Sequence, residues 1–298
     1  MTQLTGTGVA LVTPFDGKGK VDVTGLSNLI EFVIAGGVDY IVALGTTAET
    51  AVLTKAEKEL VVETVVKVTN GRLPLVLGIG GNNTASVVDE LASTNLEDFS
   101  AILSVAPYYN RPGQEGIYAH FKAIAEASPI PVIVYNVPAR TGCNMTVETT
   151  LKLAYDFDNI IGIKEASGDL NQITRILKDK PEDFLVISGD DMLALPICLA
   201  GGVGVISVVG QGLPLLFSKM IRLGIQGEAK EAYAILNQLI PAIDLAFEEG
   251  NPAGIKAILE NLKICKSTVR LPLTGASRTL KRKVATYMNQ YAMIAQED

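Results

Sequence analysis

The amino-acid sequence predicts an α/β protein whose main part is a (β/α)8 barrel. Short apolar runs rich in β-branched residues recur about every 25 to 35 residues, and segments with helical periodicity lie between them. Most of these runs are apolar at nearly every position, which is typical of parallel strands covered on both faces. The chain has 298 residues, of which 48% are hydrophobic, so it can bury a core of the size that a barrel needs.

Eight strands and the helices between them follow from these patterns. The predicted strands are 8–13, 40–44, 75–79, 101–105, 131–135, 160–164, 184–188 and 203–208. Helical patterns follow the first seven strands at 24–35, 55–69, 84–96, 116–126, 147–155, 169–178 and 191–200. Thr54 and Glu57 form a capping box at the start of the second helix. Eight strand–helix alternations within about the first 225 residues indicate a TIM barrel.

The C-terminal part shows helical patterns only, at 213–223, 227–248, 252–264 and 278–290. No stretch rich in Pro, Gly or Ser separates it from the barrel. We therefore predict a catalytic barrel over residues 1–225 and a C-terminal helical domain over residues 226–298, packed on the barrel. A doubly wound open sheet is the competing fold, because loop patterns alone do not show that a sheet closes.

Composition excludes several classes of function. The net charge of −7 argues against nucleic acid or an anionic membrane as a partner, and no apolar run reaches the ~18 residues of a membrane span. Cys143, Cys198 and Cys265 share no metal-ligand spacing, and His120, expected to face solvent, is the single histidine. We therefore expect a soluble cytoplasmic protein with free thiols, without a metal site, a cofactor or a serine–histidine triad.

Chemically active side chains follow several predicted strands, where a barrel carries its active site. They are Thr46, Thr47, Tyr108, Tyr109, Tyr135, Arg140 and Lys164, with Ile206 in the eighth strand. Burial of Lys164 at the end of its apolar run favours the neutral amine, which can attack a ketone and form an imine. Backbone amides around the two threonines suit a carboxylate, and the planar fork of Arg140 suits a second one.

Each of these residues also has a purely structural interpretation. A lone lysine is most often a surface residue or an ion-pair partner, although strand alternation places Glu165 on the face opposite Lys164. A buried tyrosine such as Tyr135 is most often a core residue. A non-catalytic barrel that binds a small acid is therefore an alternative class of function.

Long motifs on several elements resemble a known family. The segments "GTTAE", "PYYNRPGQEGIYAHF", "YNVPARTG", "IIGIKEASGD", "SGDD" and "GGVGVISV" occur in order, within a match from "GTGVALVTPF" to "VRLPLT". They resemble the pyruvate-dependent class I aldolases and, among these, the dihydrodipicolinate synthase family. This resemblance implies condensation of pyruvate with L-aspartate 4-semialdehyde on the route to diaminopimelate and lysine, by a cytoplasmic homotetramer built as a dimer of dimers.

The resemblance also implies a role for each site residue. Lys164 would form the Schiff base, and Tyr135 would transfer protons through Thr46 to Tyr109, which reaches a neighbouring subunit. The pyruvate and semialdehyde carboxylates would bind Thr47 and Arg140, and the backbone of Ile206 would line the site. N-acetylneuraminate lyases, which typically lack the arginine, and 2-keto-3-deoxy sugar acid aldolases are the alternatives. Ala48 replaces the family's usual glycine, which would strain the turn if that residue needs a positive φ.

Relatives inhibited by lysine usually carry a histidine and a glutamate at an allosteric pocket, where this chain has Lys58 and Ser86 beside a matching Asn82. A cationic Lys58 repels the lysine ammonium groups, and Ser86 supplies no charge. We therefore expect weak or absent inhibition by lysine. Assays of the purified enzyme over a lysine titration check this, and strong inhibition by submillimolar lysine contradicts it.

Overall fold

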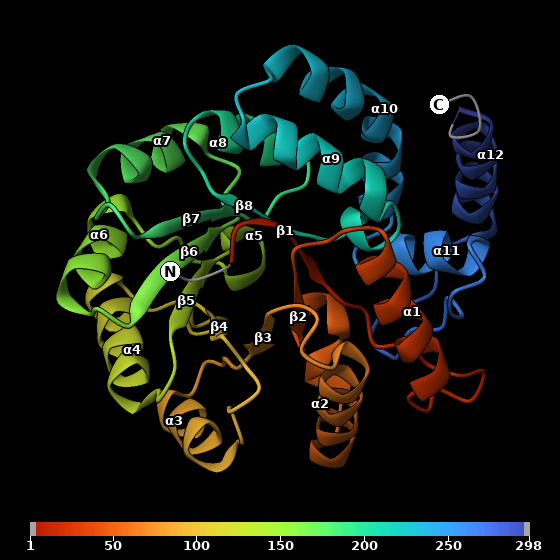
Figure 1. Cartoon of the computed structure of the whole chain (residues 1–298). Helices are drawn as coiled ribbons and strands as arrows, with labels where there is room; N and C mark the ends of the chain where they lie inside the picture. The colour runs from red at the N-terminus through yellow and green to blue at the C-terminus, as the bar shows by residue number, and fades with distance from the viewer. Residues whose placement is uncertain (1–3, 295–298) are drawn as a thin grey trace.

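Eight parallel strands close into a barrel in the computed structural model, which describes residues 4–294. The strands follow the order of the sequence, and β8 pairs with β1 to complete the ring (Figure 1). They are β1 Gly6–Ala10, β2 Tyr40–Ala43, β3 Leu75–Gly78, β4 Ala101–Val105, β5 Val132–Asn136, β6 Ile160–Glu165, β7 Leu185–Ser188 and β8 Gly204–Ser207. The predicted barrel is confirmed, and the doubly wound open sheet is excluded because this sheet has no edge strand.

Helices surround the barrel and continue beyond it (Figure 1). Those up to the end of the barrel are α1 Val23–Ala35, α2 Lys55–Thr69, α3 Thr84–Ser93, α4 Gln114–Ala127, α5 Pro138–Thr141, α6 Val147–Asp156, α7 Leu170–Asp179, α8 Ala194–Leu199 and α9 Pro214–Ile225. Three more follow, namely α10 Ala229–Phe247, α11 Ala253–Asn261 and α12 Arg278–Ile294. Within residues 4–294, none of the helices combines the length and apolar character needed to cross a membrane.

Two apolar cores hold the barrel together. One lies between the strands and the surrounding helices, and the other fills the interior of the barrel with residues that include Tyr40, Tyr135 and Ile206. The ring of Tyr40 needs the absence of a side chain at Gly8, where a Cβ would come within 2.2 Å of it. The interior is therefore a packed core, and any ligand must bind at the ends of the strands.

The first strand is shifted from its predicted range of 8–13, because the chain leaves the sheet after Ala10. There the side chain of Gln211 replaces a neighbouring strand as the hydrogen-bond partner of the backbone. It accepts from the Val12 amide at 2.9 Å and donates to the Ala10 carbonyl at 2.9 Å. The helix predicted from residue 191 begins at Ala194 instead, after a turn in which the Asp190 carboxylate accepts from the amides of Met192 and Leu193.

The prediction that His120 faces solvent is wrong. His120 lies on the inner face of α4, its Nδ1 is 2.9 Å from the Thr84 hydroxyl, and its ring packs edge-on against Phe121. Burial lowers the pKa of the imidazole to about 4, so the ring is neutral at physiological pH. His120 follows Ile117 by three positions and precedes Ile124 by four, so the helical spacing of these two buried residues places it on the inner face.

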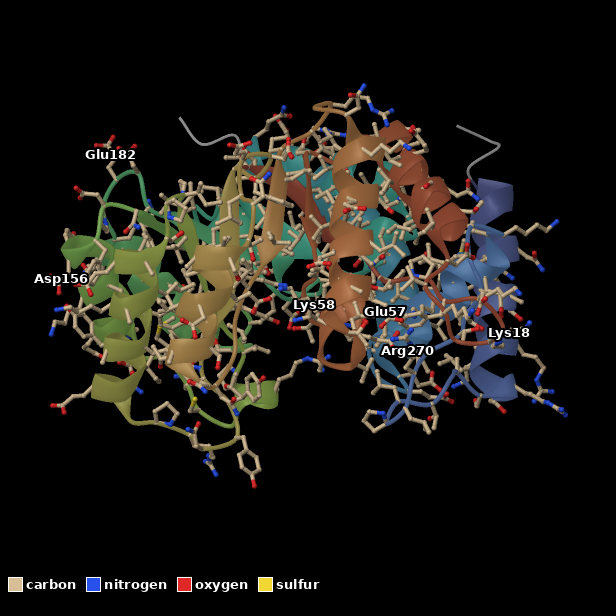
Figure 2. All side chains as sticks on the ribbon, turned by 90° about the horizontal axis from the view of Figure 1, so that it is seen from below. Lys18, Glu57, Lys58, Asp156, Glu182 and Arg270 are labelled. Atoms are coloured by element: carbon tan, nitrogen blue, oxygen red, sulfur yellow. The ribbon has the colours of Figure 1, made fainter. Side chains whose placement is uncertain are left out.

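A buried ion pair ties the C-terminal helices to the end of β2. The Lys256 ammonium on α11 lies 2.5 Å from the Glu49 carboxylate, and both side chains are withdrawn from solvent, with 0% and 1% exposure. The same amine donates to the Thr268 carbonyl at 2.8 Å, and the Arg270 amide donates to the second Glu49 oxygen at 2.9 Å. Nearby, the Arg270 guanidinium pairs with Glu57 at the start of α2, and Lys58 lies on the side of that helix toward α3 (Figure 2).

Replacing Lys256 by methionine keeps most of the apolar stem and leaves the Glu49 charge buried without its partner. We expect the free energy of unfolding to fall by about 3–5 kcal/mol. Urea unfolding followed by circular dichroism measures the loss, and Lys122→Ala, which removes the exposed Lys122–Glu126 pair, is the control, with a change of under about 1 kcal/mol. The double variant Lys256→Met/Glu49→Gln should recover part of the stability; equal stability of Lys256→Met and the control contradicts the prediction.

Candidate active site

A cavity of about 550 Å³ lies at the carboxyl ends of the strands. Its lining brings together five of the residues predicted from the sequence: Thr46, Thr47, Tyr135, Arg140 and Lys164. They come from segments at the ends of β2, β5 and β6, which the closed barrel places around one opening. Residues of α10, including Ile243 and Phe247, and Asn251 just before α11 complete the wall, so the C-terminal helices form part of the site.

Lys164 lies on β6 with its side chain only 6% exposed. It is in register with Tyr135 on β5 and Ile187 on β7, and its Nζ lies 4.4 Å from the centroid of the Tyr135 ring. Burial lowers the pKa of the Lys164 amine to about 8, against the attraction of the Asp191 carboxylate and with help from the Arg140 guanidinium. A useful fraction of the amine is therefore unprotonated near neutral pH, as a nucleophile requires.

Gly189 makes room for the lysine. A Cβ at this position would lie 3.0 Å from Cε of Lys164 and 2.7 Å from Cβ of Ala166. Any larger residue would therefore push the amine out of its place, so Gly189 is a site residue through the space that it leaves. The segment "SGDD" follows a predicted strand, which marks it as a possible site segment, but the reason for its glycine is visible only in the structure.

Asp191 holds the ends of β7 and β8 together beside the lysine. Its carboxylate accepts from the amides of Val208 at 3.1 Å and Val209 at 2.9 Å and from the hydroxyl of Ser207. Burial nevertheless raises the pKa of this carboxyl to about 6. Asp191 thus supplies the negative charge that keeps the pKa of Lys164 from falling further.

Tyr135 lies in the barrel interior with its phenol directed to the cavity, where it forms a hydrogen bond with the Thr46 side chain. Burial raises the pKa of this phenol, while the Arg140 guanidinium and the bond to Thr46 oppose the rise. The phenol and the threonine hydroxyl can each donate and accept a proton, so the pair has the chemistry of a proton relay next to the amine.

The two threonines lie on a short 3-10 helix, Thr46–Ala48, that follows β2. Thr47 is buried, and its hydroxyl oxygen accepts a hydrogen bond of 2.9 Å from Nδ2 of Asn251. The residue with a left-handed backbone is Glu49, at φ 56°, and not Ala48. Alanine therefore fits this turn without strain, and the strain expected at Ala48 is absent because the positive φ falls one residue later.

A second cavity of about 470 Å³ adjoins the first and shares Thr46, Tyr135, Arg140 and Asn251 with it. Tyr108, Lys58 and Glu90 also line this second cavity, and the Lys58 ammonium lies 3.6 Å from the Glu90 carboxylate. No sequence motif marks Glu90, which lies one helical turn after Ser86 on α3 and supplies a carboxylate that Ser86 lacks.

Two predicted site residues do not line either of these cavities. Tyr109 is 89% exposed, with φ 74°, at the tip of the loop between β4 and α4, so a single chain does not bring it to Tyr135. Ile206 is buried in the barrel interior together with Tyr135, and Val208 lines the first cavity at the end of β8 instead.

Glu165 lies on the far side of β6 from Lys164, as strand alternation requires. It is buried and accepts hydrogen bonds from Nδ2 of Asn136 at 3.0 Å, Nε2 of Gln172 on α7 at 3.0 Å and the amide of Ser167 at 2.7 Å. Burial raises the pKa of Glu165, and these donors oppose the rise. Glu165 therefore fastens the strand that carries Lys164 to the helix behind it.

Comparison with known proteins gives a consistent result over nearly the whole chain. The Dihydrodipicolinate synthetase family matches residues 3–291. A 4-hydroxy-tetrahydrodipicolinate synthase of Flavobacterium psychrophilum is 57% identical over 97% of this chain and 99% of its own. The crystal structure of the dihydrodipicolinate synthase of Aquifex aeolicus is 39% identical, with a TM-score of 0.93 and coverage of 97% and 98%. That of Acinetobacter baumannii, complexed with pyruvate, is 34% identical, with a TM-score of 0.94 and coverage of 97% and 99%.

The position of Lys164 predicts how its reactivity depends on pH. Acetylation by limiting acetic anhydride, read by mass spectrometry, should rise with pH and level off above about 8, because the neutral amine reacts and burial lowers the pKa to that value. Surface lysines in the same sample should still gain reactivity toward about pH 10. Asp191→Asn removes the charge that favours the ammonium form of Lys164. The pH at which Lys164 reaches half of its maximal reactivity should therefore be lower in this variant than in the unsubstituted chain, and a higher value contradicts this account.

Proposed function

The chain belongs to the dihydrodipicolinate synthetase family, and from this premise we propose that it acts as a 4-hydroxy-tetrahydrodipicolinate synthase that condenses pyruvate with L-aspartate 4-semialdehyde on Lys164. One observation carries the assignment of the residue. Burial holds the pKa of the Lys164 amine at about 8, in a cavity that it shares with a tyrosine, two threonines and an arginine. Such an amine can form an imine, and the neighbouring groups suit an acid with a ketone.

The first half of the reaction makes a carbon nucleophile. The neutral Lys164 amine attacks the ketone carbon of pyruvate, and the adduct loses water to give a protonated imine. This imine withdraws electrons from the pyruvate methyl group, which loses a proton and becomes the enamine carbon. Tyr135, with its hydrogen bond to Thr46 and its ring 4.4 Å from Nζ, is the proposed carrier of these protons.

The second half joins the two substrates and releases the enzyme. The enamine carbon attacks the aldehyde carbon of the semialdehyde, and the new alkoxide takes up a proton. The amino group of the joined product then attacks the imine carbon, which closes the six-membered ring and expels the Lys164 amine. Thr47 is the proposed ligand of the pyruvate carboxylate, and Arg140 that of the semialdehyde carboxylate, with the backbone of Ile206 below them.

A second copy of the chain is proposed to complete the proton relay. Tyr109 is almost fully exposed at a loop tip beside the second cavity, while Thr46 and Tyr135 line that cavity from inside. We propose that Tyr109 of a neighbouring subunit reaches this cavity in a tight dimer, and that two dimers form a homotetramer. Tyr108 beside it is also exposed, at 40%, and adjacent exposed aromatic side chains support a contact of this kind because aromatic residues are enriched at subunit interfaces.

The remaining assignments concern the whole chain. We propose that residues 1–225 form the catalytic barrel and residues 226–298 the helical domain, which agrees with the end of α9 at Ile225; residues 1–3 and 295–298 lie outside the described part. A cytoplasmic location is also proposed, and the unpaired thiols of Cys143, Cys198 and Cys265 suit a reducing compartment.

Borohydride reduction in the presence of pyruvate should fix one reduced pyruvate on the peptide that carries Lys164, and none on Lys164→Arg. Turnover assays should then favour L-aspartate 4-semialdehyde over glyceraldehyde, the aldehyde from which 2-keto-3-deoxy sugar acids are made, by roughly 100-fold or more in kcat/KM. Mass spectrometry and product analysis read the two steps. Label at another lysine refutes the mechanism, whereas label at Lys164 with preferred turnover of glyceraldehyde supports the sugar-acid aldolase instead.

A further inference from the structure

Asn251 makes a contact with the site that the sequence does not suggest. It lies just before α11, 204 positions after Thr47, and its Nδ2 donates to the Thr47 hydroxyl oxygen at 2.9 Å. Its Oδ1 is buried and has no hydrogen-bond partner among the described residues. The side chain stands between the two cavities and lines both.

We propose that Asn251 is a positioning residue that fixes the Thr47 hydroxyl as a hydrogen-bond donor toward the carboxylate of pyruvate. A threonine hydroxyl has one hydrogen to donate and two lone pairs that accept. Because Nδ2 of Asn251 occupies a lone pair, the hydrogen of Thr47 has to point elsewhere. A carboxylate accepts hydrogen bonds and donates none, so a threonine whose hydrogen is free is the form that binds it.

The direction of this hydrogen bond is the informative feature. With the amide turned over, its oxygen would accept the Thr47 hydrogen, and the hydroxyl would have no hydrogen left for a substrate. With Nδ2 as the donor, the hydroxyl keeps that hydrogen, while Oδ1 has no donor among the described residues. An unpartnered buried oxygen is unfavourable, which is expected where a residue is placed for its effect on a ligand and not for local stability alone.

The backbone on both sides of this contact is fixed independently. Lys256 on α11 pairs with Glu49 at the other end of the same turn, and the Thr13 hydroxyl donates to the Ala48 carbonyl at 2.7 Å. The turn is therefore held without Asn251, whose amide contacts a side chain of the turn and not its backbone. Asn251 is left to set the torsion of one hydroxyl group.

The inference rests on the proposed function, since it takes Thr47 as a ligand of the substrate carboxylate. Its test is a double-mutant cycle between Thr47→Val, which keeps the shape and removes the hydroxyl, and Asn251→Ala. The readout is the pyruvate concentration that gives half-maximal borohydride trapping on Lys164. Thermal unfolding of each variant accompanies it as a measure of structure.

We expect each single variant to raise the half-maximal pyruvate concentration about tenfold, and the double variant to lie within about twofold of Thr47→Val, because Asn251 acts through the hydroxyl. Asn251→Asp should be worse than Asn251→Ala, since its carboxylate can only accept from Thr47 and repels pyruvate. Asn251→Ser, which keeps a small donor, should recover part of the affinity. The maximal extent of trapping in folded Asn251→Ala and Asn251→Ser should stay that of the unsubstituted chain, because Asn251 acts through the Thr47 hydroxyl.

Additive effects of Thr47→Val and Asn251→Ala overturn the inference, as does an Asn251→Ala chain with unchanged pyruvate dependence. If Asn251→Asp does not fold, the alanine and serine variants still decide. Failure of the proposed function looks different, because the unmodified chain then forms no trapped imine with pyruvate, or forms it and does not turn over L-aspartate 4-semialdehyde. The Asn251 result can stand in the second of these cases.

Discussion

The withdrawal of one amine from water is the constraint on which the site depends. A buried ammonium is costly, and in this protein the cost falls on the form of Lys164 that cannot attack a ketone. Three neighbours determine the place and the pKa of this amine. The Tyr135 ring lies against it, Gly189 leaves it space, and Asp191 prevents its pKa from falling further. Glu165, the adjacent carboxylate in sequence, is bound to other donors behind the strand.

The protein contains a second buried lysine, and the difference between the two explains what burial alone does. Burial lowers the pKa of Lys256 as it does that of Lys164. Lys256, however, has the Glu49 carboxylate at 2.5 Å and a carbonyl oxygen at 2.8 Å, so its charge is neutralised in place. Among residues 4–294, no carboxylate lies within ion-pair distance of the Lys164 amine, so this lysine keeps a lone pair available for chemistry. Lys256 and Lys164 are thus both buried, and they differ in that only Lys256 has a carboxylate at ion-pair distance within the described residues.

The barrel could be predicted from the sequence because the periodicity of hydrophobic residues determines its strands and helices. Lys164, Tyr135 and Arg140 could also be predicted as site residues, since each lies at or just after the end of a predicted strand. Asn251 was not, because no periodic pattern links a residue before α11 to a threonine more than 200 positions earlier. The prediction for His120 was wrong because it followed the polarity of imidazole and not the helical spacing to Ile117 and Ile124. The early end of β1 depends on hydrogen bonds from the Gln211 side chain to a distant backbone segment, which composition does not reveal. What local pattern determines could be predicted; what depends on a single long-range hydrogen bond could not.

The attachment of the threonine turn to α11 also affects the order in which the site can form during synthesis. Glu49 and Thr47 leave the ribosome early, whereas their partners Lys256 and Asn251 emerge when most of the chain has already been made. All eight strands precede both partners, so a nascent barrel can close while the turn that carries the two threonines still lacks these anchors. The growing chain therefore completes the contacts of this turn only near the end of translation, after the eight strands have been made.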